Sequence, residues 1–270
     1  MSFMTDDERL IKKCNGRNGT FHYLAHDVYV GRSMELYGEW SQGEVDKVCG
    51  ATKQGDCVIE VGSNMGTHTI PIAKHIGNNG KLIAFEPQRI MHQILCANII
   101  ENGLTNVWTY NCAVSNEVGT IHVLDLSLTD EHNFGGVRVG QNQGSTVDVK
   151  SIDSLGLPRV DFIKVDAEGY EPQVLLGAQK TILRDRPPML IEYNRNSRQE
   201  INRVLRLFNY RAWECNEPIY VKSNFNHNDN NIYPNIYSMN IFLSVDQIPG
   251  VTDTMRELSS GELAWHGHNN

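Results

Sequence analysis

The chain lacks several features that mark other classes of protein. It has no apolar run near the ~20 residues that a membrane span requires. Its N-terminus, MSFMTDDERLIKK, carries acidic residues where a signal peptide would have a hydrophobic segment. Its six cysteines form no C-x-x-C pair, and several lie in apolar stretches, as reduced thiols do. No internal repeat is present. We therefore expect a cytoplasmic protein without a membrane partner.

An excess of basic charge is lacking as well. The chain has 24 Lys and Arg against 32 Asp and Glu, which gives a formal net charge of −8. This balance argues against a general nucleic-acid binder. Arginines concentrate in one region: Arg184, Arg186, Arg195, Arg198, Arg203, Arg206 and Arg211. We interpret them as a solvated helix face and leave open a local patch for an anionic substrate or partner.

Short apolar runs and amphipathic segments alternate from residue 56 onward. The runs DCVIEV, KLIAFE, VWTYNCAV, GTIHVLDL, STVDVKSI, RVDFIKVD, PPMLIEY, RAWE and IYSMNIFLSV predict strands. The segments MGTHTIPIAKHI, QRIMHQILCANIIENG, YEPQVLLGAQKTILRD and RQEINRVLRLFNY predict helices, with Pro71 near the first turn of one of them. This alternation predicts an α/β fold, in which a mostly parallel, doubly wound sheet carries helices on both faces.

The flanking segments read differently. We predict an N-terminal extension over 1–50, a core domain over 51–248 and a mobile acidic tail over 249–270, where His266 and His268 lack the partners of a metal site. In the extension we expect residues 1–20 to be loosely ordered and FHYLAHDVYV (21–30) to form a short hairpin. Ser41 and Glu44 have capping-box spacing, which predicts a helix from about 41 to Gly50. The Asn-rich stretch 224–235 predicts an exposed loop, with a lid over a pocket as the alternative.

A glycine-rich turn, Gly62-Ser63-Asn64-Met65-Gly66, follows the first strand of the core. Glycines allow a tight turn and close approach of a ligand, and exposed amides at the next helix suit an anionic group. The dinucleotide fingerprint G-x-G-x-x-G, however, has a glycine where this chain has Asn64. Glu60, two residues before the turn, would also repel a pyrophosphate and attract a cation. Both features argue against a dinucleotide.

A second acidic residue, Glu86, ends the next strand 24 residues after Gly62. A carboxylate at this position accepts hydrogen bonds from both hydroxyls of a ribose. A ligand that has a ribose, an amino-acid carboxylate and an ammonium group, but no pyrophosphate, fits the turn, Glu60 and Glu86 together. S-adenosylmethionine is such a ligand.

Six segments, in order, resemble the FkbM-type S-adenosylmethionine-dependent methyltransferases: YGEWSQGEV, VIEVGSNMGTHTIPIA, IAFEPQ, CAVS, NFGG and DFIKVDAEGYEPQVLLGA. The resemblance covers about residues 28–245. It implies a Rossmann-like class I methyltransferase fold with an antiparallel last strand. It also implies O-methylation of a hydroxyl on a sugar or other small hydroxylated acceptor, with S-adenosylhomocysteine as the second product.

The resemblance also implies which residues bind the cofactor. The loop on the methionine side would comprise Glu60, Gly62, Ser63, Asn64, Gly66, Thr67, His68 and Thr69. Glu86 would bind the ribose, Pro87 and Gln88 would flank the adenine, and Asn111, Cys112 and Ala113 would edge it. Asn111 departs from the acid that many relatives have there, and VDAEG lacks the larger aliphatic that usually precedes the glutamate. Tyr37 would lie over the cofactor or substrate pocket.

The stretch DFIKVDAEGYE carries the candidate chemistry. Phe162, Lys164 and Asp166 alternate along one strand face, and Asp166 lies where the strand leaves the sheet. We expect Asp166 to lie beside the methyl group, within the cofactor site, as a base or a positioning group. Glu168 and Glu192 are the next candidate acids, and Asn133 is a candidate for holding a substrate hydroxyl. A buried Lys164–Glu168 ion pair explains those two residues about as well as catalysis does.

Several alternatives stay open. Asp166, Glu168, Glu192 and Asn194 could form an oxygen-rich site for a divalent metal, which we do not favour because no fixed spacing supports it. A nucleotide-dependent oxidoreductase on the same fold and a catalytically silent cofactor-binding module are the other function classes. The expected partner is a small-molecule or saccharide acceptor, whose pocket we assign to segments 21–30, 125–146 and 224–235. An oligomer is left open.

Overall fold

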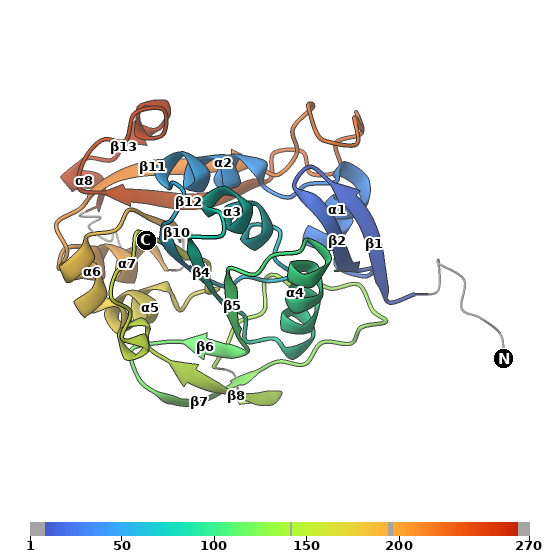
Figure 1. The fold of residues 1–270 in the computed structure, drawn as a ribbon, viewed down its shortest axis with the longest axis horizontal. Coiled ribbons are helices and arrows are strands. Elements are labelled where there is room, and N and C mark those ends of the chain that lie inside the picture. The colour runs from blue at the N-terminus through green and yellow to red at the C-terminus, as the bar shows by residue number, and fades with distance from the viewer. Residues whose placement is uncertain (1–8, 141, 194–196, 264–270) are drawn as a thin grey trace, which may run out of the picture.

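The computed structural model describes residues 9–140, 142–193 and 197–263. Its centre is an eight-stranded sheet with the strand order β13-β11-β12-β10-β9-β3-β4-β5 (Figure 1). The strands are β3 (Cys57–Val61), β4 (Lys81–Phe85), β5 (Val107–Tyr110), β9 (Phe162–Val165), β10 (Met189–Glu192), β11 (Arg211–Pro218), β12 (Tyr237–Ser244) and β13 (Arg256–Glu257). From β5 to β10 all neighbours pair in parallel, whereas β12 runs antiparallel to β10 and β11. The predicted mostly parallel sheet with a reversed strand near its C-terminal end is confirmed.

Helices cover both faces of this sheet (Figure 1). On one face lie α2 (Gln42–Ala51), α3 (Thr69–Ile76) and α4 (Arg89–Glu101), which pack on residues such as Val58 and Phe162. On the other lie α5 (Glu171–Gly177), α6 (Gln179–Asp185) and α7 (Arg198–Leu205), which pack on Ile59 and Ile163. Pro71 lies in the first turn of α3, where its missing N–H costs nothing. The predicted helix over YEPQVLLGAQKTILRD is divided at Ala178, whose backbone is not helical.

Three predicted strands leave the central sheet. The run VWTYNCAV is divided at Asn111, whose side-chain amide donates to the backbone oxygens of Glu86 and Pro87 at 2.8 and 3.0 Å. Beyond this break, β6 (Cys112–Val114), β7 (Gly119–Val123) and β8 (Ser145–Lys150) form a separate sheet in the order β6-β8-β7, at the bottom of Figure 1. After β8 a 3₁₀ turn, η2 (Ile152–Leu155), leads back to β9.

The N-terminal hairpin is displaced from its predicted position. It consists of β1 (Ile11–Gly16) and β2 (Gly19–Leu24), so the prediction of a hairpin over 21–30 was wrong, and residues 11–16 are not loosely ordered. Residues 25–29 instead turn into α1 (Val30–Tyr37), where buried Asp27 accepts from the Gly31 N–H at 3.0 Å. Residues 1–8 lie outside the described part of the chain.

Buried polar side chains connect these elements to the core. Asn98 of α4 donates to the Met65 backbone oxygen at 2.8 Å and accepts from the His22 N–H at 2.6 Å, which fastens the hairpin to the turn after β3. The helix predicted near residue 41 begins at Gln42, as expected. The capping box, however, is not formed, because the Ser41 hydroxyl bonds to the Glu44 side chain at 2.8 Å rather than to backbone N–H groups.

The segment after β12 also differs from the predicted tail. Val251 is buried, η3 (Thr252–Thr254) follows it, and β13 pairs antiparallel with β11 before α8 (Ser260–Leu263). Residues 251–257 therefore pack on the edge of the sheet, whereas His266 and His268 lie outside the described residues.

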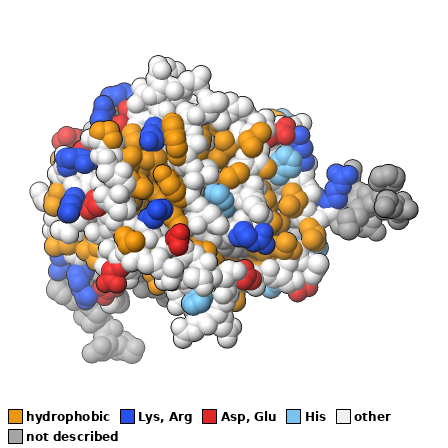
Figure 2. Space-filling view, turned by 60° about the horizontal axis from the view of Figure 1, so that its bottom comes forward, with side chains coloured by type: hydrophobic (Ala, Val, Ile, Leu, Met, Phe, Trp, Pro, Cys, Tyr) orange, Lys and Arg blue, Asp and Glu red, His pale blue; other side chains and the backbone are white. Residues whose placement is uncertain are grey.

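The surface carries mixed charge. Arg184 of α6, Arg203 of α7 and Arg211 of β11 pair with neighbouring acidic side chains. These arginines are thus solvated but do not share one helix face as predicted, and Arg195 lies outside the described residues. Figure 2 shows basic and acidic side chains interspersed around hydrophobic ones on the face that it presents. Among the described residues, no helix is both long and apolar enough to cross a bilayer. All six cysteines are free.

Candidate active site

A pocket of about 340 Å³ opens at the carboxyl edge of the parallel strands. Of the predicted site residues, it brings together Gly62, Ser63, Asn64, Thr67, His68, Glu86, Pro87, Gln88, Cys112, Ala113, Asn133, Asp166, Glu168 and Glu192. Five others do not line it: Tyr37, Glu60, Gly66, Thr69 and Asn111. The topology explains the convergence, because ligands of open α/β sheets bind where parallel strands end and loops diverge.

The turn after β3 needs glycine for two separate reasons. Gly62 has a φ of +80°, and a Cβ there would lie 1.8 Å from the backbone oxygen of Asp166. Its N–H and that of Ser63 both donate to the Phe85 backbone oxygen, at 2.9 and 3.0 Å. Residue 62 therefore brings the ends of β3, β4 and β9 into contact, and the pocket forms above this junction.

Glu86 lies at the end of β4 and is 3% exposed. One carboxylate oxygen accepts from the Asn64 N–H and the other from the Gln88 N–H, each at 2.8 Å. Burial raises the pKa of Glu86 to about 7, although the two N–H groups oppose the shift. Both oxygens keep a lone pair for a further donor, so this fixed carboxylate can bind two neighbouring hydroxyls of a ligand.

Three predicted cofactor residues act from behind the pocket wall. Glu60 is 1% exposed and accepts from the Thr69 hydroxyl at 2.5 Å, which joins β3 to the start of α3. Gly66 packs against Leu95, which a Cβ would meet at 2.7 Å. Asn111 is turned onto the backbone beside Glu86, as described above. These residues shape the turn, and their side chains do not face the pocket.

The β9 end carries a buried ion pair. Lys164 is 2% exposed, and its Nζ lies 3.6 Å from Asp166 Oδ2. The Asp166 side chain is 41% exposed toward the pocket. Its partly enclosed position raises its pKa, although Lys164 opposes the shift. Lys164 thus pairs with Asp166 and with Glu44, and not with Glu168 as the sequence had suggested.

Glu168 follows in a strained turn. Its φ of +50° is unusual for a residue with a side chain, and Glu171 of α5 stabilises the turn by accepting from the N–H groups of Ala167 and Gly169. Burial raises the pKa of Glu168 to about 7, helped by Asp166 and Glu171. Strain and a perturbed acid in one pocket are common at functional sites.

Asp166, Glu168 and Glu192 lie close enough for a metal ion. Each offers an oxygen, and these three oxygens lie within 4.8 Å of one another. Carboxylate oxygens suit Mg²⁺ or Ca²⁺, so these residues could hold a divalent cation. Asn194, the fourth residue that the sequence suggested, lies outside the described residues.

Sequence reasoning missed part of the wall. Glu44 of α2 and Ser238 and Asn240 of β12 also line the pocket. The Ser238 hydroxyl donates to Glu44, and Asn240 donates to Ser238 at 2.5 Å. Burial alone would raise the pKa of Glu44. His68, Lys164 and the hydroxyls of Ser238 and Ser41 outweigh burial and hold this pKa below its ordinary value. Its capping-box spacing was the only signal in the sequence, and it suggested a different role.

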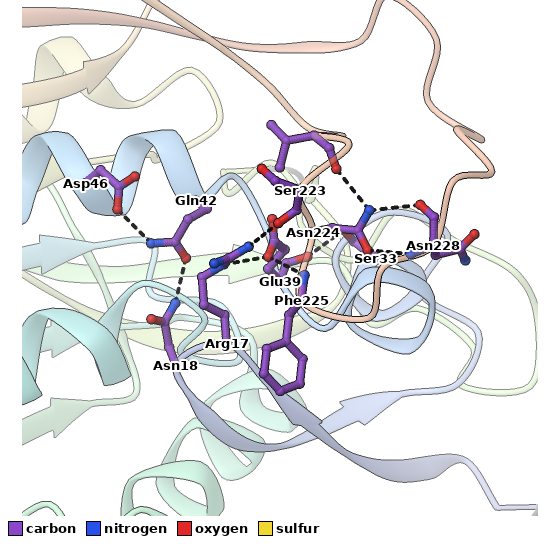
Figure 3. Close-up of polar contacts among 11 residues, drawn as sticks. Arg17, Asn18, Ser33, Glu39, Gln42, Asp46, Ser223, Asn224, Phe225 and Asn228 are labelled. Atoms are coloured by element: carbon purple, nitrogen blue, oxygen red, sulfur yellow. Dashed lines mark hydrogen bonds and ion pairs between the residues drawn. The ribbon is translucent and has the colours of Figure 1, made fainter.

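The loop between β11 and β12 (residues 219–236, here the Asn-rich loop) is fastened to the N-terminal extension (Figure 3). Glu39 accepts from Arg17 Nε at 2.7 Å and from the Phe225 N–H at 2.9 Å. Tyr37, predicted to cover the pocket, is 1% exposed beneath this loop and donates to the Asn230 oxygen at 2.8 Å. Ile219 and Ile236, at the two ends of the loop, line the pocket, whereas residues 224–235, which were assigned to the acceptor pocket from the sequence, do not. The N-terminal extension therefore holds the loop whose ends form one side of the pocket.

Comparison with known proteins adds three matches. The family model described as the methyltransferase FkbM domain matches residues 56–213, more than half of the chain. The methyltransferase sdnD of Sordaria araneosa is 23% identical over 157 residues, which cover 46% of this chain and 60% of that relative. The crystal structure of methyltransferase FkbM from Methylobacillus flagellatus KT has a TM-score of 0.50 and 16% identity, over 71% of this chain and 44% of that one. The chain thus spans less than two thirds of either relative, and at this identity the structural match shows the fold alone.

Proposed function

The chain belongs to the FkbM methyltransferase family, and from this premise we propose that it methylates a hydroxyl group of a small acceptor, such as a sugar, with S-adenosylmethionine as the donor. The observation that carries the proposal is the buried Glu86 carboxylate, fixed by two N–H groups beside the Gly62 turn. A ribose and an amino-acid end fit this arrangement, and Asn64 lies where a pyrophosphate-binding turn has a glycine.

The residues divide the pocket into two halves. In the nucleoside half, Glu86 would accept from the ribose hydroxyls, and Pro87, Gln88, Cys112 and Ala113 would border the adenine. The methionine end would then extend past Asn64 and Thr67 toward the end of β9. We assign the acceptor to the part of the pocket that is lined by β10, β12 and the two ends of the Asn-rich loop.

The donor, when bound, supplies a methyl group on a positively charged sulfur. When the methyl group is transferred, the rest of the donor leaves as S-adenosylhomocysteine. The chain must align the acceptor oxygen with that methyl group and remove its proton. Asp166, held by Lys164, would position the hydroxyl, and Asn133, which lines the same pocket, would contact that hydroxyl as well. Glu168 would accept the proton, because a pKa of about 7 suits a general base at neutral pH. Glu192, which lies close to both acids, would add negative charge on this side of the pocket.

Calorimetric titration with S-adenosylhomocysteine, with NADH as the control, tests this function. We expect micromolar binding of the first and none of the second. Binding of NADH alone would favour an oxidoreductase and refute the proposal. Binding of S-adenosylhomocysteine without transfer of labelled methyl to any hydroxylated acceptor would favour a catalytically silent module. Repeating the transfer assay after chelation tests the divalent metal that the three carboxylates could hold, which the proposal does not require.

A further inference from the structure

Two buried polar atoms in the acceptor half have no hydrogen-bond partner among the described residues: His68 Nε2 and Glu44 Oε2. His68 is 7% exposed and Glu44 is 4% exposed, and both line the pocket. A buried polar atom without a hydrogen bond is costly, and it calls for an explanation. Two such atoms on one wall of a ligand pocket indicate that a ligand satisfies them.

The position of Glu44 assigns this wall to the acceptor. Its other carboxylate oxygen accepts from Ser238 of β12 and from Ser41. Three steps across the sheet, β12-β10-β9-β3, separate β12 from the strand that carries the Gly62 turn, and Glu86 lies on the opposite side of that turn. Glu44 Oε2 lies 3.9 Å from Lys164 Nζ of β9 and 4.0 Å from His68 Nδ1, neither of which is a hydrogen bond. Because β9 and β12 lie on one side of β3 and β4 lies on the other, Glu44 and Glu86 lie on opposite sides of the Gly62 turn.

The chemistry of the two atoms defines what they can bind. The Glu44 carboxylate accepts hydrogen bonds only. Burial and the nearby Lys164 lower the pKa of His68 to about 4, so the imidazole is neutral at physiological pH. The carboxylate beside Nδ1 favours the tautomer with the proton on that nitrogen, which leaves Nε2 as an acceptor. Glu44 Oε2 and His68 Nε2 are therefore both hydrogen-bond acceptors and need donors from the ligand. An ionised phosphate or carboxylate group has no hydrogen to donate and would not satisfy them.

We propose that Glu44 and His68 form a specificity subsite that accepts hydrogen bonds from a second hydroxyl of the acceptor, next to the hydroxyl that is methylated. The acceptor is therefore a neutral molecule with at least two neighbouring hydroxyls. The inference rests on the proposed methyltransferase function. It assigns these residues to the acceptor, although the sequence had placed His68 beside the cofactor.

The test measures methyl transfer from labelled S-adenosylmethionine to methyl glucoside and to its singly deoxygenated forms. We expect the full-length protein to prefer the parent over at least one deoxy form by about tenfold or more, the effect of one hydrogen bond left unmade. Glu44→Gln replaces Oε2 by an NH₂ group, while its amide oxygen can still accept from Ser41 and Ser238. His68→Leu removes the second acceptor, and His68→Gln restores one.

In Glu44→Gln and His68→Leu the preference should shrink to within about threefold, and His68→Gln should recover part of it. Affinity for S-adenosylhomocysteine should stay within about threefold in all three. His75→Gln is the matched control: His75 lies on the same helix, contacts the Thr52 backbone oxygen at 2.9 Å and does not line the pocket.

Three results would overturn the subsite. The variants could lose S-adenosylhomocysteine affinity as strongly as transfer, which would place both residues against the cofactor. The preference could survive both substitutions. The wild-type chain could bind S-adenosylhomocysteine yet methylate none of the glucosides. Absence of S-adenosylhomocysteine binding to the wild type would instead refute the proposed function, so the two failures are distinguishable.

Discussion

Gly62 offers a strong test of how the pocket is built. Replacement by alanine imposes two costs that the structure separates. The left-handed backbone, with φ at +80°, costs a residue with a Cβ about 1–2 kcal/mol. The Cβ would also lie 1.8 Å from the Asp166 backbone oxygen, whereas real Cβ contacts below 3.0 Å essentially never occur, so the two backbones must separate by more than 1 Å.

The second cost can be isolated with a matched variant. Gly156 also has a positive φ, +59°, but a Cβ there would meet nothing within 4 Å, and Gly156 does not line the pocket. Gly156→Ala should therefore show the backbone cost alone, a drop in Tm of roughly 2–6 °C. Gly62→Ala adds an overpacking cost of about 1–3 kcal/mol, and its drop should reach roughly 5–15 °C.

Binding should separate the two variants further. Displacement at residue 62 moves the turn that supplies the Asn64 N–H to Glu86, so affinity for S-adenosylhomocysteine should fall at least about tenfold. Gly156→Ala should bind like the wild type. Thermal melting and calorimetry measure both effects. Equal Tm losses, together with wild-type affinity in Gly62→Ala, would refute the claim that residue 62 joins β3 to β9.

The remaining predictions concern single side chains. Asp166→Asn should lower the turnover of an accepted glucoside at least about 100-fold while changing S-adenosylhomocysteine affinity by no more than about tenfold, and unchanged turnover would remove Asp166 from the mechanism. Because Glu86 has a pKa of about 7 and its ionised form accepts from ribose hydroxyls, S-adenosylhomocysteine affinity should rise with pH and level off above about pH 7; Glu86→Gln should abolish that rise, and a rise that persists in the variant would assign it to another group. Glu39→Ala removes the acceptor for Arg17 and for the Phe225 N–H, so hydrogen exchange at 223–228 should accelerate and stability should fall by about 1–3 kcal/mol; unchanged exchange would show that Glu39 does not hold the Asn-rich loop.

The sequence was most informative where periodicity and position coincide. Apolar runs that alternate with amphipathic segments predicted the parallel sheet, because each strand must be buried on both faces. Gly62 directly follows one such run and Glu86 ends another. Because the two strands are parallel, both residues lie at the same edge of the sheet. The hairpin was displaced because the polar β1 gives no apolar signal: its residues alternate between exposed and half-buried before Gly16.

Contacts between distant segments could not be predicted in this way. Glu44 has the spacing of a helix cap, yet it faces the pocket because Ser238, 194 residues later, holds it there. The partner of Lys164 was misassigned for a related reason. Asp166 and Glu168 both follow β9, but Asp166 is the one that pairs with Lys164, and Glu168 lies in the turn beyond it with a positive φ that the sequence does not reveal.

The buried charges around Lys164 explain why acids in one pocket differ in how readily they ionise. Burial lowers the pKa of Lys164, but Asp166, Glu44 and Glu60 outweigh it and raise the pKa above its ordinary value. Its charge in turn favours the ionised forms of Glu44 and Asp166 in a region where burial disfavours them. Glu168 lies farther along the turn, and Lys164 is not among the groups that shift its pKa, so Glu168 keeps the raised pKa that proton transfer requires. Lys164 thus favours the ionised forms of the two acids beside it, whereas Glu168, like Glu86 in the other half of the pocket, has a pKa of about 7 and can exchange a proton near neutral pH.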